Sequence, residues 1–220
     1  MEDLIIESSI TDYFKREEVS NSDLTWLKMQ LSPADVVGDI VRAYKFGTLV
    51  DAIITEQQRI DYFKLTVDDI QYTADEFKKA NKMRRAFMQD ELGKLILSSA
   101  VFQEVKTKKV DFNYAGMKFS LNMRCKFDFR FPPLNYGGDI KSTTATTQEQ
   151  FEASIAHFDY DRQRAVYMTI TDAPMDVVIG ISKINFKVFK KFIKRGDETF
   201  NRGMDKLNFL AYKYYLLFGE

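Results

Sequence analysis

Residues 119–141 have the sequence FSLNMRCKFDFRFPPLNYGGDIK, and this stretch decides the fold. From Phe119 to Phe131 apolar and polar residues alternate without a break, which is typical of a β-strand with one buried face. Pro132 and Pro133 end this strand because proline cannot donate to a strand ladder, and Tyr136 begins the next one. The stretch therefore predicts two consecutive strands joined by a short connection.

The segment before this strand alternates in the same way, with Val110, Phe112 and Tyr114 on one face. Ala115-Gly116 lies between the two alternating stretches, and glycine readily adopts the backbone of a tight turn. Together the two stretches predict a β-hairpin.

Apolar residues at helical spacing occupy much of the remaining chain. Ser22 or Asp23 is a suitable N-cap for a short helix that buries Leu24 and Leu27. The other helices that we predict cover residues 1–16, about 33–43, 47–57 after a break at Gly47, 67–97 with an interruption near Gly93, 148–170 with a break near His157, and the chain from about Asp197 onward. We predict a strand near 176–184 and a strand or short helix near 186–194.

This order of elements predicts an α/β protein with a mixed central sheet, a β-hairpin and flanking helices. The chain has 220 residues, no internal repeat and no long linker, so we expect a single domain over 1–220. Within it, 1–97 is mainly helical, 98–195 holds the sheet and its helices, and 196–220 is a C-terminal helix.

Residue counts exclude several kinds of site. The chain has one cysteine, Cys125, and one histidine, His157, which excludes a disulfide framework, a Cys-based zinc site and a multi-histidine metal centre. The N-terminus is acidic and lacks the pattern of a signal peptide, and no apolar run approaches about 18 residues. We therefore expect a cytoplasmic protein.

The net charge is zero, with 32 basic and 32 acidic residues, but the basic residues are clustered. Residues 77–85 and 183–195 contain no acid and combine basic with aromatic side chains. Such clusters suit a surface that follows the phosphates of a nucleic acid. The alternative is that each is an ordinary solvated helix or strand face.

Asp128, Asp139 and Lys141 are the strongest candidates for chemistry. Asp139 and Lys141 share a strand face because side chains at i and i+2 point the same way, whereas Ile140 points into the core. If the two strands pair, Asp128 and Asp139 come within reach of one cation. Two carboxylates and a main-chain carbonyl form a hard oxygen set suited to Mg²⁺ or Mn²⁺. Lys141 beside it would orient or deprotonate a bound water, or stabilise the charge that develops on the phosphorane. The alternative is a surface salt bridge.

Several patches, in their order along the chain, resemble the PD-(D/E)xK nuclease superfamily. The likeness is greatest to phage and prophage recombination exonucleases of the exonuclease VIII (RecE-like) and RecB-nuclease type. The patches are SNSDLTWLKMQLSP at 20–33, FGTLVDAIITE at 46–56, Asp128 followed by GGDIKST at 137–143, FDYDRQRAVYM at 158–168 and GDETFNRGMDKL at 196–207. They span about residues 18–210, and the resemblance implies the restriction-endonuclease-like core of that superfamily.

The resemblance also implies roles for residues. Asp128 and Asp139 would bind the metal together with the carbonyl of Ile140, and Lys141 would be the catalytic lysine. Glu104 lies where many relatives carry an acid that assists the metal; its alternative is a surface strand residue.

Gln163 and Tyr167, at i and i+4 on one helical face, would contact the scissile phosphate or the water, and Tyr160 would join them. Their alternative is ordinary helix packing. The basic residues that we expect to contact DNA are Lys82, Arg84, Arg85, Arg124, Lys126, Lys190 and Lys191.

One position departs from the family pattern. Where relatives have a metal-binding histidine in the Gly-Thr helix, this chain has Asp51. A carboxylate can replace an imidazole toward a hard cation, and its charge would favour Mg²⁺. The substitution could instead mark a lost ligand and reduced activity. His157 lies far along the chain and is expected at a helix boundary.

Three functions are compatible with the sequence. The resemblance implies a Mg²⁺- or Mn²⁺-dependent exonuclease that hydrolyses double-stranded DNA ends in phage-type recombination or repair. Its expected partners are duplex ends, a single-strand annealing protein and further copies of the chain in a ring. The second is a weakened nuclease fold that binds DNA or a recombination partner without cleavage. The third is an unrelated α/β module.

Overall fold

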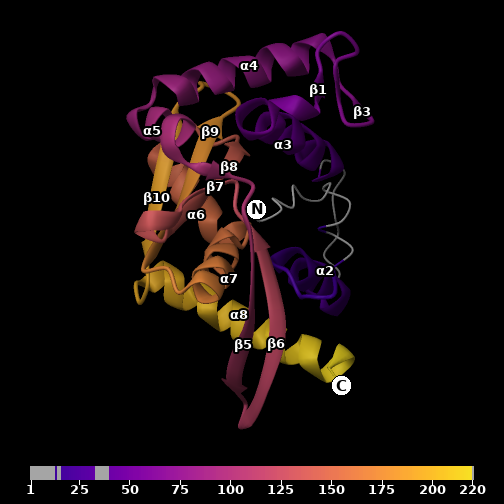
Figure 1. Cartoon of the computed structure of the whole chain (residues 1–220), viewed down its shortest axis with the longest axis vertical. Coiled ribbons are helices and arrows are strands. Elements are labelled where there is room, and N and C mark those ends of the chain that lie inside the picture. Colours follow the sequence, from indigo (N-terminus) through magenta and orange to yellow (C-terminus); the bar gives the residue numbers. More distant parts are fainter. Residues whose placement is uncertain (1–12, 14–15, 33–39, 220) are drawn as a thin grey trace, which may run out of the picture.

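A five-stranded mixed sheet forms the centre of the fold. The computed structural model describes residues 13, 16–32 and 40–219 (Figure 1). The strands follow the order β10-β9-β8-β7-β4, in which β8 and β9 are parallel and the other neighbours are antiparallel. Their bounds are β4 Val101–Phe102, β7 Phe129–Phe131, β8 Tyr136–Thr143, β9 Met175–Ser182 and β10 Val188–Lys194. The α/β class with a mixed central sheet is therefore confirmed.

The long alternating stretch is divided between two sheets. β5 (Val105–Tyr114) and β6 (Met117–Lys126) form the predicted hairpin, which turns at Ala115 and Gly116 with positive φ angles of 52° and 78°. The chain then bends at Asp128 and enters the central sheet as β7. Each apolar member of the alternation is at most 8% exposed, so the pattern predicted burial correctly but not the change of sheet.

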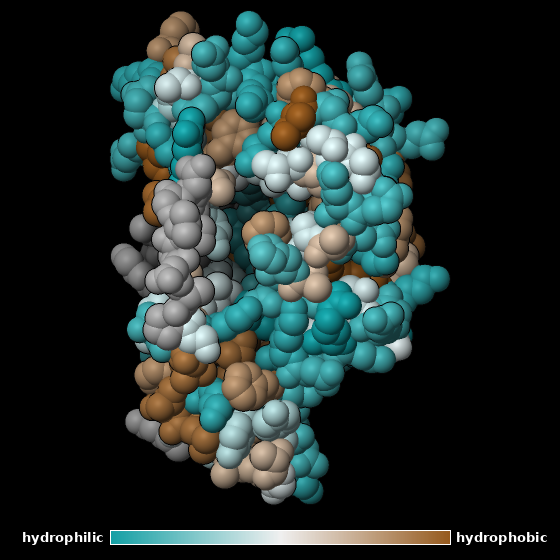
Figure 2. All heavy atoms as spheres, turned by 180° about the vertical axis from the view of Figure 1, so that it is seen from behind, coloured by the Kyte–Doolittle hydropathy of each residue, from teal (hydrophilic) through white to brown (hydrophobic). Residues whose placement is uncertain are grey.

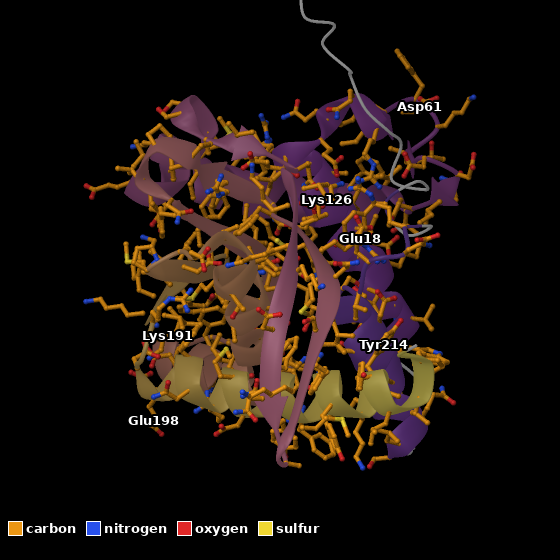
Figure 3. The ribbon with its side chains drawn as sticks, turned by 60° about the horizontal axis from the view of Figure 1, so that its bottom comes forward. Glu18, Asp61, Lys126, Lys191, Glu198 and Tyr214 are labelled. Atoms are coloured by element: carbon orange, nitrogen blue, oxygen red, sulfur yellow. The ribbon has the colours of Figure 1, made fainter. Side chains whose placement is uncertain are left out.

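The hairpin lies across the C-terminal helix α8, Glu198–Phe218 (Figure 3). A core cluster joins Phe119 and Met123 of the hairpin to Leu207 and Leu210 of α8. The helix begins after the N-cap Asp197, as predicted, because the Asp197 side chain accepts from the Phe200 N–H.

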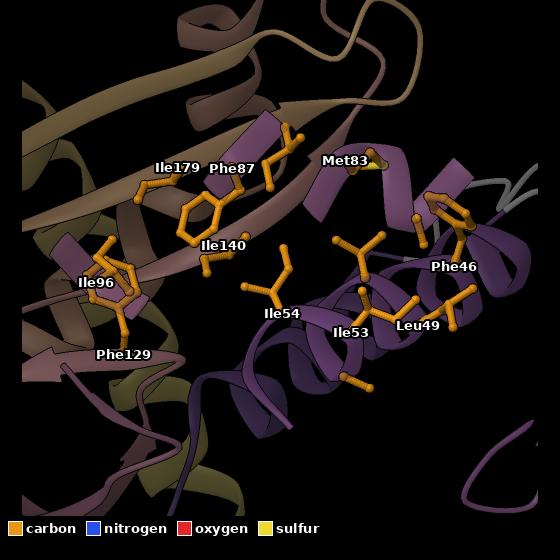
Figure 4. Close-up of a cluster of buried hydrophobic side chains, with 14 of the residues drawn as sticks. Phe46, Leu49, Ile53, Ile54, Met83, Phe87, Ile96, Phe129, Ile140 and Ile179 are labelled. Atoms are coloured by element: carbon orange, nitrogen blue, oxygen red, sulfur yellow. The ribbon is translucent and has the colours of Figure 1, made fainter. Parts of the chain in front are cut away.

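Helices cover both faces of the central sheet. On one side, Ile53 and Ile54 of α3 and Phe87 of α4 pack with Ile140 and Ile179 of the sheet (Figure 4). On the other side, a cluster joins residues of α6, α7 and α8 to the sheet. The helix bounds are α2 Asn21–Leu31, α3 Ile40–Thr55, α4 Ala74–Gln89, α5 Glu91–Ser99, α6 Gln148–His157 and α7 Tyr160–Thr171.

Short elements complete the described chain. A small antiparallel sheet consists of β1 (Ile60–Asp61), β2 (Thr66–Val67) and β3 (Ile70–Gln71). Two 3-10 helices cover Gln57–Arg59 and Pro132–Leu134.

Some helix boundaries differ from the prediction. Gly47 does not break a helix, because α3 runs through it from residue 40 to 55. The segment 67–97 begins as β-structure and becomes helical only after Thr73, whose side chain forms a capping box with Glu76. The interruption falls at Asp90, which ends α4 and caps α5, rather than at Gly93.

Other boundaries agree closely with the prediction. α2 buries Leu24 and Leu27, although its N-cap is Ser20. α6 ends at His157, and residues 188–194 form a strand. The helix predicted over 1–16 lies almost wholly outside the described residues, as does most of the one predicted over 33–43.

Apolar side chains gather on the surface where α2 meets the end of α8, visible as brown atoms at the lower left of Figure 2. The Trp26 and Phe218 rings are 6.3 Å apart there, and each side chain is about half exposed. No helix among the described residues is long and apolar enough to span a membrane.

Candidate active site

The carboxylates meet where the chain changes sheets. Asp128 occupies the bend between β6 and β7, and β7 pairs with β8 in a register that places Phe129 opposite Gly138. This pairing brings Asp128 beside the second strand, where its Oδ2 accepts from the Ile140 N–H at 2.7 Å. Asp139 and Lys141 flank Ile140 on β8, and their side chains form an ion pair. The structure thus brings the three candidate residues together.

The Lys141 amine remains charged in this arrangement. Burial alone would lower its pKa, but the charges of Asp139 and Asp128 outweigh burial and raise it above the ordinary value. The amine also lies over the Tyr160 ring, 5.3 Å from its centroid. Lys141 can therefore attract an anion or orient a water, but it is not poised to remove a proton.

Asp51 joins the cluster from α3. Burial, followed by the charges of Glu56 and Asp139, raises its pKa to about 6, against a hydrogen bond from Thr55 that lowers it. Burial and the charges of Asp139 and Asp51 raise the pKa of Asp128 well above its ordinary value. Three carboxylates from different elements therefore repel one another at one place.

This donor set fits a divalent cation in its chemistry. Carboxylate oxygens are the ligands that Mg²⁺ and Mn²⁺ prefer, and a cation would offset the repulsion between Asp51, Asp128 and Asp139. In the part of the chain that the structure describes, no group of three or more His, Cys, Asp or Glu side chains is already arranged to hold a metal ion. The three aspartates are therefore suitable ligands by residue type, and Lys141 forms an ion pair with one of them, Asp139.

Of the helical residues with predicted roles, Gln163 reaches the cluster. Its Nε2 donates to Asp139 Oδ1 at 3.1 Å. Tyr167 instead donates its hydroxyl to the carbonyl of Lys126 at 2.9 Å and packs edge-on against Phe127. Tyr167 therefore supports the bend beside Asp128 rather than contacting the carboxylates directly.

Glu104 points away from the cluster. Its carboxylate pairs with Lys106 at 2.7 Å and Arg130 at 3.0 Å, and no contact of Glu104 with the three aspartates appears among the described residues. The neighbouring Gln103 faces the site instead, with Nε2 2.9 Å from Thr55 Oγ1 and 3.4 Å from Asp51 Oδ1.

A buried arginine, which the sequence did not indicate, supports Asp139. Arg164 of α7 places one nitrogen 3.2 Å from Asp139 Oδ1 and another 3.2 Å from Asp176 of β9. All three side chains are almost completely buried. A charged residue in a mixed helical pattern carries no signal of such a contact, because its partners are distant in sequence.

A pocket of about 1,100 Å³ opens over the cluster. Asp51, Asp128, Ile140 and Lys141 lie in its wall. Figure 2 shows a hollow near the centre of that view, with hydrophilic side chains in its depth and both hydrophilic and hydrophobic ones around its rim. Other described residues that line the pocket include the basic Arg42, Lys79 and Lys183 and the aromatic Tyr44, Phe158 and Tyr160. Of these, Lys79 and Lys183 lie in the two basic segments predicted to follow phosphates, 77–85 and 183–195. None of the pocket residues is among those predicted individually to contact DNA.

The residues predicted to contact DNA are dispersed. Arg124 is only 2% exposed and pairs with Asp23 at 3.2 Å, so its guanidinium belongs to the interior. Lys82 and Arg85 are exposed on α4, with Arg84 half-buried between them.

The other three predicted lysines have acidic neighbours. Lys190 pairs with Asp90 at 2.5 Å, and Lys191 pairs with Glu152 at 3.0 Å. Lys126 lies 3.9 Å from Glu56. These acidic neighbours neutralise part of the clustered positive charge at the protein surface.

One family model matches most of the chain. The family model described as "PDDEXK-like domain of unknown function (DUF3799)" matches residues 17–214. No curated protein sequence matches the chain.

Two solved structures match the chain, and the first has a similar fold. One, from Eubacterium rectale and described as "Putative exonuclease", has a TM-score of 0.63 and 16% identity, and the match covers 94% of this chain and 85% of that one. A phage related exonuclease from Haemophilus somnus 129PT gives a TM-score of 0.42 and 13% identity, covering 75% of this chain and 80% of that one.

The family match and the fold shared with the Eubacterium rectale protein show a nuclease-like fold, and PD-(D/E)xK nucleases generally use divalent metals. Asp128 and Lys141 line the pocket, and Asp139 is paired with Lys141. By its match over residues 17–214, the chain belongs to the family of PDDEXK-like domains.

Proposed function

We propose that the protein is a Mg²⁺- or Mn²⁺-dependent DNA exonuclease that hydrolyses phosphodiester bonds at double-stranded ends. The observation that carries this proposal is that Asp128, Asp139 and Lys141 meet at an open pocket, joined by the ion pair between Lys141 and Asp139 and by the hydrogen bond from the Ile140 N–H to Asp128. Phosphodiester hydrolysis can use carboxylates and an amine placed together at a pocket. A simple surface salt bridge requires neither the further carboxylate nor the pocket.

Each side chain of the cluster has its own role in this proposal. Asp51, Asp128 and Asp139 would hold the cation, which when bound polarises the phosphodiester and lowers the pKa of a water. The positive charge of Lys141 orients that water and stabilises the negative charge that develops on the phosphate. Gln163 restrains Asp139 through its hydrogen bond.

The pocket supports the choice of a nucleic acid as substrate. Basic side chains at its wall attract phosphates, and aromatic side chains there can stack on bases. We further propose that the protein acts in the cytoplasm of a bacterial or phage-infected cell, beside a single-strand annealing protein and as a ring-shaped oligomer.

Digestion of linear duplex DNA with Mg²⁺ or Mn²⁺ tests the activity. We expect Lys141→Ala and Asp139→Ala each to lower the rate at least about 100-fold, because the first removes the positive charge beside the phosphate and the second removes a carboxylate that would hold the cation. Lys108→Ala is the matched control, since Lys108 pairs with Asp172 on the hairpin side and should leave the rate unchanged.

Covalently closed circular DNA and end-labelled duplex distinguish an exonuclease from an endonuclease. Degradation of linear but not closed circular DNA supports the proposal. Equal rates in wild type, Lys141→Ala and Asp139→Ala would exclude catalysis at this site. Salt-sensitive DNA binding without any cleavage would favour a non-catalytic binding protein instead, a function compatible with Asp51 at the position of the usual histidine.

A further inference from the structure

Gln103 lies at a strained point of the backbone beside the carboxylates. It has a φ of +57° between β4 and β5, in the left-handed region that residues other than glycine rarely adopt. Such conformations persist where the surrounding structure enforces them, and they are frequent at functional sites. The contacts of Gln103 therefore indicate why this backbone conformation is kept.

Its contacts reach two of the three aspartates. The Gln103 N–H donates to the Asp128 carbonyl at 3.2 Å, which fastens the β4–β5 connection to the bend that carries Asp128. The Gln103 Nε2 donates to Thr55 Oγ1 at 2.9 Å and lies 3.4 Å from Asp51 Oδ1. The Thr55 hydroxyl in turn donates to the same oxygen of Asp51 at 2.8 Å.

These hydrogen bonds act on one carboxylate oxygen from two directions. Gln103 and Thr55 both engage Oδ1 of Asp51, so they fix the rotation of the carboxylate group relative to α3. Partners of this kind orient metal ligands and commonly change metal affinity when they are removed. The left-handed backbone of Gln103 is what turns its amide toward Asp51, while the next side chain, Glu104, points to Arg130.

We propose that Gln103 is a positioning residue that holds Asp51 and Asp128 in the orientation needed to bind a divalent cation; this inference rests on the proposed function. Gln103 acts through these aspartates and does not contact the reacting atoms. Its backbone strain is retained because the conformation aims its amide.

Substitution of Gln103 by glycine separates the effect of its amide contacts from the effect of its backbone strain. Gln103→Gly removes the amide and at the same time relieves the positive φ, because glycine adopts this conformation freely. We expect the thermal midpoint of Gln103→Gly in EDTA to equal or exceed that of wild type, while its Kd for Mn²⁺, measured by isothermal titration without DNA, rises about ten-fold. Gln103→Ala, which keeps the strain, should show the same loss of affinity.

Ala115→Gly is the matched control. Ala115 has a φ of +52° at the exposed hairpin turn, so glycine relieves the same kind of strain without touching the site. It should raise the thermal midpoint and leave Mn²⁺ affinity unchanged.

The results separate this inference from the proposed function. If Asp139→Ala abolishes Mn²⁺ binding but both Gln103 variants bind as wild type does, the positioning role is overturned and the metal site stands. If Gln103→Gly loses stability and affinity together, the residue is merely structural and the inference is again overturned. If wild type and Asp139→Ala bind Mn²⁺ alike, the metal site itself fails and the inference fails with it.

Discussion

At the scale of single residues, the Asp51 carboxylate makes the stability of the protein depend on pH. Its pKa is about 6 in the folded chain, against an ordinary value of 3.8. Between these values the folded chain binds more protons than the unfolded chain, so the free energy of unfolding falls as the pH rises from about 4 to about 6. The charged form that the site needs is therefore the less stable form.

Replacing Asp51 by asparagine should remove this dependence. The amide oxygen keeps an acceptor for Thr55 but carries no charge. In EDTA at pH 7 we expect Asp51→Asn to be more stable than wild type by on the order of 2 kcal/mol, with the difference vanishing near pH 4. Urea unfolding at several pH values measures it, and parallel curves for the two proteins would contradict the assignment.

Sequence patterns indicated the Asp139–Lys141 pair but not all of its surroundings. Two residues at i and i+2 on one strand face share a site for purely local reasons, and the strand pairing then supplies Asp128. The order of Gln103 and Glu104 could not be predicted, because the left-handed backbone at Gln103 reverses which of the two faces Asp51. Arg164 could not be predicted because both of its partners, Asp139 and Asp176, lie on other elements.

At the scale of the elements, β8 depends on the close approach of its neighbours. A Cβ at Gly138 would lie 2.5 Å from the Phe129 ring and 2.6 Å from the Val177 carbonyl oxygen. A Cβ at Gly47 in α3 would have no neighbour within 4 Å. The two glycines thus have opposite reasons for being in the sequence.

Alanine should therefore act in opposite directions at these positions. We expect Gly138→Ala to destabilise the fold by about 1–3 kcal/mol through overpacking, and Gly47→Ala to stabilise it by about 0.5–1 kcal/mol through helix propensity. Chemical denaturation of both variants in one buffer gives the comparison. Equal effects of the two substitutions would show that the packing around Gly138 is not as close as described.

Alternation predicted the strands well because burial of one strand face leaves a local pattern. It did not predict that β6 and β7 belong to different sheets, because the pattern contains no information on hydrogen-bonding partners. Helix ends were less predictable because tertiary packing and caps also determine where a helix stops. Gly47 and Gly93 both lie within helices because tertiary packing outweighs the modest helix preference against glycine, and Asp90 interrupts α4 and α5 through its cap.

At the scale of the whole molecule, Cys125 reports on the integrity of the fold. It lies on β6 with no exposed surface, and burial raises the pKa of its thiol to about 12. Since the thiolate is the reactive form, the native thiol should resist alkylation at pH 8.

Iodoacetamide labelling tests this directly. We expect no adduct in the native protein over hours and complete single labelling in urea, read as one mass increment because Cys125 is the sole cysteine. Rapid labelling without denaturant would mean that the interface between the hairpin and α7–α8 opens readily.

The bend at Phe127–Asp128 has a consequence for how the protein is made. The hairpin consists of contacts between neighbours in sequence and can form as soon as residue 126 is available. Asp128 gains its companions only after β8 has paired and α7 has delivered Gln163 and Arg164 to Asp139. A nascent chain that ends before α7 therefore holds no assembled carboxylate cluster, and we expect any metal binding at Asp128 and Asp139 to arise only after α7 has been made.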